Sequence, residues 1–384
     1  MANSNSAIVI KRAEIFVFRA PIDEPVRTSF GVMQDRPAVL LRLEDADGAH
    51  GWGEAWCNFP TCGAEHRARL LESVIAPLLI GRSFASPTNA YKYLREKTRT
   101  LALQADEPGP LAQTTAAADL ALWDLFSRKR SLPLHRFLGG TGKGVMPAYA
   151  SGINPTGVLA TIEKSRELGY RAFKFKIGFN AEQDLLNIRE TSAFLQAGES
   201  LAVDANQAWK LPFALEFAAK LKSSPLAWLE EPLRCDAHLS QWGILQQHCP
   251  VPLAGGENIR NAGDFHAVIH SRVLTVIQPD ICKWGGLSDC LPVASAVLAA
   301  GLRYCPHYLG GGIGLMASAH LLAAVGGDGL LEIDVNVNPL REALAVPYPE
   351  LKDGLLQLSE EAGLGVEPAI KELESLLVMY KELS

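Results

Sequence analysis

The chain has 384 residues, of which 48% are hydrophobic and 20% charged; these values are typical of a globular protein, and the length is typical of two domains. Lys and Arg number 36 against 42 Asp and Glu, a net charge of −6 without a basic run, so neither nucleic acid nor an anionic membrane surface is an expected partner. No apolar run reaches membrane-spanning length, the first 20 residues lack a signal-peptide pattern, and seven cysteines are scattered without a CxxC spacing. These features together predict a cytoplasmic protein with reduced thiols.

The first part of the chain carries the pattern of a small α+β domain. Strand-like runs occupy residues 8–56, and two of them flank the turn signal Asp47-Gly48, which predicts a hairpin. Strands followed by helices favour an α+β arrangement. Apolar residues at three- and four-residue spacing predict those helices over 65–81, 87–104 and 109–130.

From about residue 145, short strand-like runs alternate with helical stretches. Eight such runs predict a (β/α)8-type barrel over roughly 145–340. A doubly wound parallel sheet is the structural alternative, but it usually has a Gly-rich phosphate turn after its first strand, and this sequence has none. The eight runs are MPAYAS (146–151), AFKFKIG (172–178), LAVDAN (201–206), AWLEEP (227–232), PLAGGEN (252–258), LTVIQPD (274–280), LRYCPH (302–307) and LLEIDV (330–335).

Three of these runs end in carboxylates at a regular interval. Asp204, Glu230 and Glu257 are 26 and 27 residues apart, and a barrel would bring them to one side of its mouth. Converging carboxylates repel one another unless a hard cation lies between them, and ligation by oxygen alone favours Mg²⁺. The alternative is that they cap helices or form surface salt bridges.

The run AFKFKIG alternates charged and apolar residues, so Lys174 and Lys176 share one face of the strand. On a surface strand this pattern would be ordinary. Inside a barrel, desolvation and mutual repulsion would lower an ammonium pKa, which makes a lysine base near neutral pH. Across the mouth, Asp280 and His307 end adjacent strands, where the carboxylate would fix the imidazole tautomer. The set predicts removal of the proton next to a carboxylate, with the enediolate stabilised by Mg²⁺.

Seven motifs follow one another in the order of a known family. They are AAADLALWDLFSRKRSLPLHRFLGG (116–140), FKFKIG, VDANQAW, WLEEP, GGEN, QPDICKWGG and CPH. Through them the chain resembles the mandelate racemase-like subgroup of the enolase superfamily over nearly its whole length. The resemblance implies an α/β fold, a modified TIM barrel of (β/α)7β type. It divides the chain into an N-terminal α+β capping domain (1–142), the barrel (143–345) and a C-terminal segment that returns to the capping domain (346–384).

The resemblance also assigns roles by position. It makes Asp204, Glu230 and Glu257 the ligands of a Mg²⁺ cofactor, within the Lys or His base and Mg²⁺ scheme already known for the superfamily. It makes Lys176 the base on one face of the substrate and His307, paired with Asp280, the acid/base on the other. Three further residues would serve the substrate: Lys174 beside its carboxylate, Glu332 as a protonated hydrogen-bond donor to that carboxylate, and Asn206 as a contact or a structural residue. A homo-oligomer acting on a small carboxylate is implied as well.

Substrate choice in this family comes from loops of the capping domain, here 22–34 and 56–63. Arg27 is a candidate to hold a distal carboxylate or hydroxyl of the substrate, and Trp56 and Phe59 are candidates for an apolar wall. The alternative for each is a solvent-exposed loop residue or one that packs the two domains together.

The family implies several reactions, of which dehydration of an acid sugar to a 2-keto-3-deoxy acid is the first expectation. The alternative is a racemase or epimerase of an α-substituted acid. A muconate-type cycloisomerase is disfavoured, because Asp280 stands where those relatives have a lysine, and Lys283 lies three residues further on. A non-catalytic module would not need so many buried charges, and a Schiff-base aldolase would not need three carboxylates.

Overall fold

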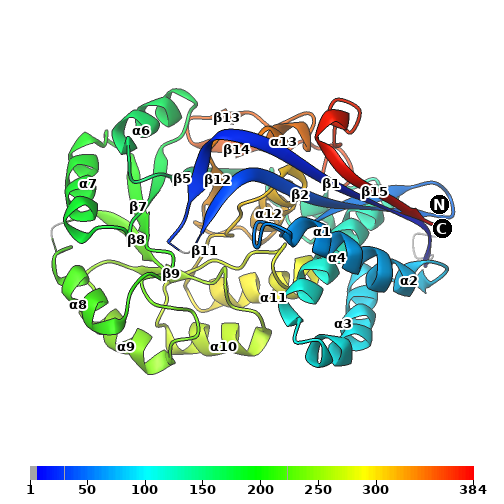
Figure 1. The fold of residues 1–384 in the computed structure, drawn as a ribbon, viewed down its shortest axis with the longest axis horizontal. Coiled ribbons are helices and arrows are strands. Elements are labelled where there is room, and N and C mark those ends of the chain that lie inside the picture. Colours follow the sequence, from blue (N-terminus) through cyan, green and yellow to red (C-terminus); the bar gives the residue numbers. More distant parts are fainter. Residues whose placement is uncertain (1–6, 30, 223) are drawn as a thin grey trace.

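The computed structural model describes residues 7–29, 31–222 and 224–384. Its N-terminal part, up to residue 137, forms an antiparallel sheet covered by helices, as predicted, and the C-terminal strand joins this sheet. The sheet order is β15-β1-β2-β3, with a short β4 paired to β1. The strands are β1 (Ile8–Arg27), β2 (Val32–Asp45), β3 (His50–Ala55), β4 (Ser83–Phe84) and the C-terminal β15 (Leu377–Leu383), which lies beside β1 (Figure 1). The helices are α1 (Gly63–Leu70), a π-helical turn (Leu71–Ile75), α2 (Ala76–Leu79), α3 (Pro87–Gln104), α4 (Pro108–Lys129) and α5 (Leu134–Phe137).

The second half is a ring of eight strands with seven intervening helices, so the (β/α)7β barrel is confirmed. The sheet runs β11-β10-β9-β8-β7-β6-β5 in parallel, and β12 pairs with β5 on its other side. The strands are β5 (Val145–Ile153), β6 (Ala172–Lys176), β7 (Ser200–Asp204), β8 (Leu226–Glu230), β9 (Leu253–Gly255), β10 (Val276–Ile277), β11 (Arg303–Tyr304) and β12 (Leu331–Asp334). The helices are α6 (Val158–Glu167), α7 (Ala181–Phe194), α8 (Leu211–Ala219), α9 (Leu239–His248), α10 (Ala262–Ser271), α11 (Gly286–Ala299) and α12 (Gly312–Val325).

The chain ends with α13 (Pro339–Ala343), the hairpin β13 (Leu351–Lys352) and β14 (Leu355–Gln357), a 3-10 turn (Glu374–Leu376) and β15. The hairpin pairs with β5 of the barrel, whereas β15 joins the N-terminal sheet. The domain boundaries at 142 and 345 stay a prediction. Among the described residues, no helix has both the length and the apolar character needed to cross a membrane. All seven cysteines are free thiols.

Alternation along the barrel strands stacks two layers of side chains inside the ring. The lower layer is apolar and takes one residue from each strand or its flank: Tyr149, Ala172, Ala202, Trp228, Ala254, Val276, Cys305 and Leu330. Because side chains on a strand repeat every two residues, the next inward position lies two residues later. Those positions are Ser151, Lys174, Asp204, Glu230, Gly256, Gln278, His307 and Glu332. A polar layer therefore lies directly above an apolar floor, toward the C-terminal ends of the strands.

Two carboxylates of the N-terminal half bind the starts of barrel helices. Glu54, on β3, accepts hydrogen bonds from the backbone N–H of Gly311 (2.6 Å) and Gly314 (2.9 Å) at the start of α12. Asp119, on α4, accepts from the N–H (2.9 Å) and hydroxyl (2.6 Å) of Ser288 in the first turn of α11. Neither helix has a side-chain cap of its own, so these contacts satisfy helix N-termini that would otherwise lack acceptors.

The β1–β2 hairpin reaches from the N-terminal half across to the barrel (Figure 1). Near its tip, the hydroxyl of Ser29 donates to the carbonyl of Asn206 at 2.6 Å, just beyond β7. On β2, the buried Arg36 pairs with Asp334 at the end of β12 at 2.5 Å. The capping loop is thereby fixed over the mouth of the barrel.

Candidate active site

Lys174 and Lys176 point into the barrel, so their strand is not an ordinary surface strand with its charged face in solvent. Only 1% of the Lys174 side chain and 13% of the Lys176 side chain are exposed, while Phe173 and Phe175 pack on the other face in the main hydrophobic core. In register, Lys176 lies beside Asp204, and Asp204 beside Glu230. The strands thus place a lysine beside two successive carboxylates on the inner face of the ring.

Each lysine is paired with a carboxylate. Lys174 Nζ lies 2.6 Å from Glu230 Oε1 and 2.7 Å from Glu332 Oε1, and Lys176 Nζ lies 2.6 Å from Asp204 Oδ2. Burial lowers the pKa of both ammonium groups, but the adjacent carboxylates outweigh it, so both pKa values are raised. The predicted lowering of the lysine pKa is therefore wrong for this arrangement, because the sequence did not reveal these pairings. Any ligand that draws Asp204 away from Lys176 removes the charge that raises its pKa.

Glu230 is held by three donors. Besides Lys174 at Oε1, its Oε2 accepts from Trp228 Nε1 (3.0 Å) and Gln278 Nε2 (2.7 Å). Burial raises the pKa of Glu230 to about 7, because Lys174 only partly offsets burial and the repulsion of Asp204 and Glu332. Neither Trp228 nor Gln278 is among the residues predicted from the sequence. The signal was available, since each lies on the inward face two residues before a predicted site residue.

The predicted pairing of His307 with Asp280 is present. His307 Nδ1 lies 2.8 Å from Asp280 Oδ2, and Asp280 Oδ1 accepts from the backbone N–H groups of Cys282 (2.8 Å) and Lys283 (3.1 Å). His307 Nε2 lies 2.6 Å from Glu257 Oε2. Burial lowers the pKa of His307, but Glu257 and then Glu332 raise it, and the net pKa is well above the ordinary value. The imidazolium is therefore enclosed between two carboxylates.

Glu257 reaches the mouth through an irregularity of the backbone. Strict alternation along β9 would turn it away from the ring, but Gly256 adopts φ +140°, which ends the alternation. A Cβ at Gly256 would also lie 2.8 Å from the backbone nitrogen of Gln278. Only glycine fits there at low cost.

Glu332 is ionised here, contrary to the expectation of a protonated donor. Its Oε1 accepts from the Ser151 hydroxyl and from Lys174, and its Oε2 accepts from the Tyr308 N–H at 3.1 Å. Burial raises its pKa, but Lys174 and His307 outweigh burial and lower it to about 2. The neighbouring cations decide its charge state, and they are not adjacent in sequence.

The three predicted metal ligands fit a hard divalent cation in their chemistry. Asp204 and Glu230 are buried on adjacent strands, Glu257 follows the next strand, and all of their donors are oxygen. Glu231 lies near Glu257 and Asp204, and burial together with their repulsion raises its pKa well above the ordinary range. Yet each ligand carboxylate is turned toward a lysine or His307, and among the described residues no three His, Cys, Asp or Glu side chains are grouped closely enough to hold an ion. The ligand set stays a prediction.

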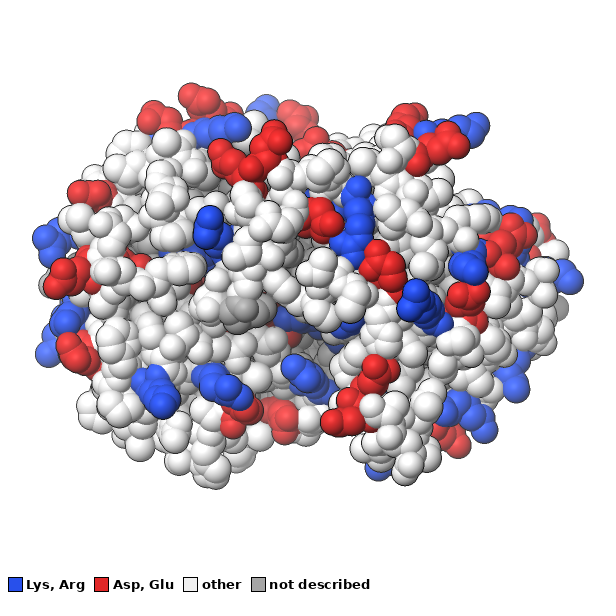
Figure 2. Space-filling model, viewed as in Figure 1, with Lys and Arg blue, Asp and Glu red and all other residues white. Residues whose placement is uncertain are grey.

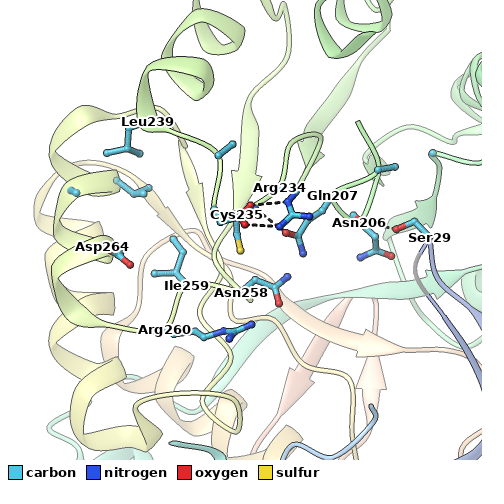
Figure 3. Close-up of a pocket in the computed structure, with 16 residues that line it drawn as sticks. Ser29, Asn206, Gln207, Arg234, Cys235, Leu239, Asn258, Ile259, Arg260 and Asp264 are labelled. Carbon is cyan, nitrogen blue, oxygen red and sulfur yellow. Dashed lines mark hydrogen bonds and ion pairs between the residues drawn. The ribbon is translucent and has the colours of Figure 1, made fainter. Parts of the chain in front are cut away.

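Two cavities open at the mouth, on the side of β7, β8 and β9. One, of about 950 Å³, is lined by Ser29, Asn206, Gln207, Arg234, Cys235, Asn258, Arg260 and their neighbours (Figure 3). The other, of about 330 Å³, lies between the two domains. It is lined by Trp56, Arg67, Gly109, Pro110, Gln113, Gln207, Glu257, Asn258, Arg260 and Lys283.

The predicted substrate contacts divide between these cavities and the surface. Asn206 lines the larger cavity; its amide Nδ2 bonds Asp204 at 3.2 Å, and its Oδ1 is buried without a partner. It also adopts φ 43°, as Gln207 (64°) and Glu231 (38°) do, which costs energy and is typical of functional sites. Trp56 lines the smaller cavity with Lys283 Nζ 4.8 Å from its ring centroid. Arg27 is exposed at the end of β1 and lines neither cavity, so the structure does not bring it to the site.

Comparisons with known proteins agree with this architecture. Residues 12–139 match the model of the mandelate racemase / muconate lactonizing enzyme N-terminal domain, and residues 157–372 match the enolase C-terminal domain-like model. The chain is 50% identical to the mandelate racemase/muconate lactonizing enzyme of Bordetella bronchiseptica RB50 in a solved structure. The match has a TM-score of 0.90 and covers 97% of this chain and 100% of that one.

Characterised relatives with names for their reactions are more distant. Arabinonate dehydratase of Saccharolobus solfataricus is 26% identical over 85% of this chain and 87% of its own length. N-succinylamino acid racemase of Thermus thermophilus is 28% identical over 98% and 99%. Others at similar identity are named cycloisomerases. The chain belongs to the mandelate racemase/muconate lactonizing enzyme family of the enolase superfamily, and it is an enzyme of the lyase or isomerase kind.

Proposed function

We propose that the enzyme dehydrates an acid sugar to a 2-keto-3-deoxy acid, beginning with removal of the proton next to the carboxylate. The observation that supports this proposal is the position of two titratable groups, the largely buried Lys176 and the buried His307, on opposite sides of one ring. Lys176 ends β6 and His307 follows β11, and these strands are separated by β7–β10 on one side and by β12 and β5 on the other. A substrate between them would meet a proton-transfer group on each face.

The residues then divide the work. Lys176 takes the α-proton at Nζ, which requires it to be neutral and no longer paired with Asp204. Lys174, already bonded to Glu332, holds the substrate carboxylate, and His307 donates the proton with which the β-hydroxyl leaves as water. The enol tautomerises to the 2-keto acid, so atoms balance with one water lost. Asp204, Glu230 and Glu257 would hold Mg²⁺, which as a Lewis acid would stabilise negative charge on the carboxylate.

Racemisation or epimerisation of an α-substituted acid is the second candidate, because the same two groups on opposite faces suffice for it. A cycloisomerase is the third. The absence of a lysine at position 280 disfavours the muconate type, but relatives named as sugar-acid cycloisomerases share this family. The homo-oligomer implied by the resemblance stays a prediction.

The test is proton NMR in D₂O of mono- and diacid sugars and simple α-hydroxy acids, with Mg²⁺ and again with EDTA. Loss of an α-proton signal together with a new 2-keto acid, only with metal, is expected. Deuterium incorporation with the other stereoisomer as sole product would instead support the second candidate. Lys176→Ala should abolish turnover while thermal unfolding still shows stabilisation by Mg²⁺. Lys220→Ala is the matched control, because this exposed lysine directly follows α8 and pairs only with Glu216 among the described residues. Turnover untouched by Lys176→Ala would contradict the mechanism.

A further inference from the structure

Arg67 is a buried cation without a buried anion. It lies on α1 and is 4% exposed. Its Nε donates to Gln113 Oε1 at 2.8 Å, Nη1 to the carbonyl of Gly63 at 3.3 Å, and Nη2 to the carbonyl of Phe59 at 3.4 Å. All three acceptors are neutral, and within the part of the chain that the structure describes no carboxylate lies within ion-pair distance of the guanidinium. Since a guanidinium has five N–H groups, two remain for another acceptor.

This arrangement is costly for the protein alone. Arginine is rarely fully buried unless it is paired, because removing its charge from water without a counter-charge is unfavourable. The effect is visible in the pKa of Arg67, which burial lowers from its ordinary value. Gln113 is an amide where an aspartate or glutamate would have neutralised the charge. The missing counter-charge therefore points to something that enters the site.

The cavity of about 330 Å³ extends from Arg67 to Glu257, the predicted metal ligand that His307 contacts at 2.6 Å. Arg67 and Gln113 line it from the capping domain, and Glu257 and Lys283 line it from the barrel mouth. This volume is in the range of small-molecule sites. Figure 2 shows a hollow between the two halves of the molecule with Lys and Arg atoms in and beside it.

The other basic groups near this cavity are less suited to hold an anion alone. Lys283 is already paired with Glu257 at 3.3 Å and bonded to Asn258 at 3.2 Å. Arg260 is exposed at the border with the larger cavity, where water screens its charge (Figure 3). Arg67 combines burial, two N–H groups that remain for another acceptor, and the lack of a carboxylate partner among the residues that the structure describes.

We propose that Arg67 binds a second carboxylate of the substrate, at the end remote from the carboxylate that reacts, so that the preferred substrates are sugar diacids. The inference rests on the proposed function, in which Lys174 and the predicted metal ligands hold the reacting carboxylate. A single carboxylate cannot occupy both places. A carboxylate at Arg67 would form a charge-assisted, bidentate pair, which is the strongest polar contact that this residue offers.

The experiment compares matched pairs of probes on the Mg²⁺-loaded enzyme: four- to six-carbon sugar diacids, from tartrate to galactarate, and the corresponding monoacids such as galactonate. We measure kcat/KM and the shift of the thermal unfolding midpoint for each. Arg67→Met should lower kcat/KM for the best diacid about 100-fold, mainly through KM, and change the monoacids less than about threefold. Arg69→Met, an exposed arginine on the same helix, should change neither.

Gln113→Glu supplies a test that keeps Arg67 and its packing. The new carboxylate lies on Arg67 Nε and neutralises it from within, so discrimination for diacids should fall as in Arg67→Met while the fold gains stability. Equal loss on diacids and monoacids in both variants would overturn the proposal, as would a wild-type enzyme that neither turns over nor is stabilised by any diacid more than by its monoacid. Failure of the proposed function is distinct, because it shows as no exchange of any α-proton in D₂O, while the midpoint shift still reports diacid binding.

Discussion

Asp280→Asn should prevent His307 from acting as a base while every other side chain of the site is retained. Asp280 Oδ1 accepts two backbone N–H groups, from Cys282 at 2.8 Å and Lys283 at 3.1 Å. An asparagine will keep its carbonyl oxygen there and turn its NH₂ group to His307 Nδ1, which must then accept. A neutral imidazole accepting at Nδ1 carries its proton on Nε2 and cannot take another there.

Escape from this arrangement requires the amide to flip, which turns its NH₂ group toward the two backbone N–H groups. The buried N–H of Cys282 then loses its acceptor, whereas that of Lys283 also donates to the Asp280 carbonyl at 3.1 Å. At about 1–3 kcal/mol for one unsatisfied donor, the flip costs a rate loss of about 5- to 160-fold.

The assay is α-proton exchange in D₂O, followed separately for the two stereoisomers of an accepted acid. The isomer whose proton faces His307 should lose exchange by the factor above, and the isomer whose proton faces Lys176 should change less than about threefold. Asp289→Asn, a partly exposed carboxylate on α11, is the control. Equal loss for both isomers, or no loss for either, would refute the reasoning about the tautomer.

Two further predictions concern the scaffold. Burial lowers the pKa of His320 to about 3, so between pH 4 and 6 this histidine takes up a proton only in the unfolded chain. As the pH falls through this range, the free energy of unfolding should therefore decrease by about 1.4 kcal/mol per pH unit more in the wild type than in His320→Gln. Urea unfolding at several pH values measures the two slopes, and equal slopes would contradict the prediction. Gly53→Ala should prevent stable folding, because the new Cβ would lie 1.9 Å from the carbonyl oxygen of Ala117 on α4. Gly48→Ala, at φ +83° in open space, should lower the free energy of unfolding by only about 1 kcal/mol. Soluble yield and the thermal unfolding midpoint compare the two variants, and equal stability would show that β3 and α4 can move apart.

Much of the fold follows from two periodicities. The repeat of two along the barrel strands places Lys174, Asp204, Glu230 and Glu332 on the inward face, and the helical spacing gives α3 and α4 within one residue. Both patterns are local, so a single sequence contains them. The same regularity would have pointed to Gln278, which occupies the inward position before Asp280.

What the sequence could not supply depends on contacts between distant segments. The charge of Lys176 depends on Asp204, and that of Glu332 depends on Lys174 and His307, so their pKa shifts went against expectation. Arg67 gave no signal, because an arginine on an amphipathic helix is ordinary until its burial and the neutral character of Gln113 are known. Arg27, in a loop expected to contact substrate, lies on the surface instead.

Two carboxylates of the N-terminal part bind the N-termini of the barrel helices α11 and α12. These contacts affect how enzymes with this fold can evolve new substrate preferences. The barrel carries the proposed proton-transfer groups, yet two of its helices start on Glu54 and Asp119, which belong to the N-terminal α+β part of the chain. If relatives exchanged the whole N-terminal part, the new part would have to place both carboxylates in the same positions, or the N-termini of α11 and α12 would lack these acceptors. Single substitutions in the cavity wall, such as an exchange of amide and acid at position 113, leave both of these contacts in place. New substrates are therefore more accessible to this scaffold by single residues than by recombination of its halves.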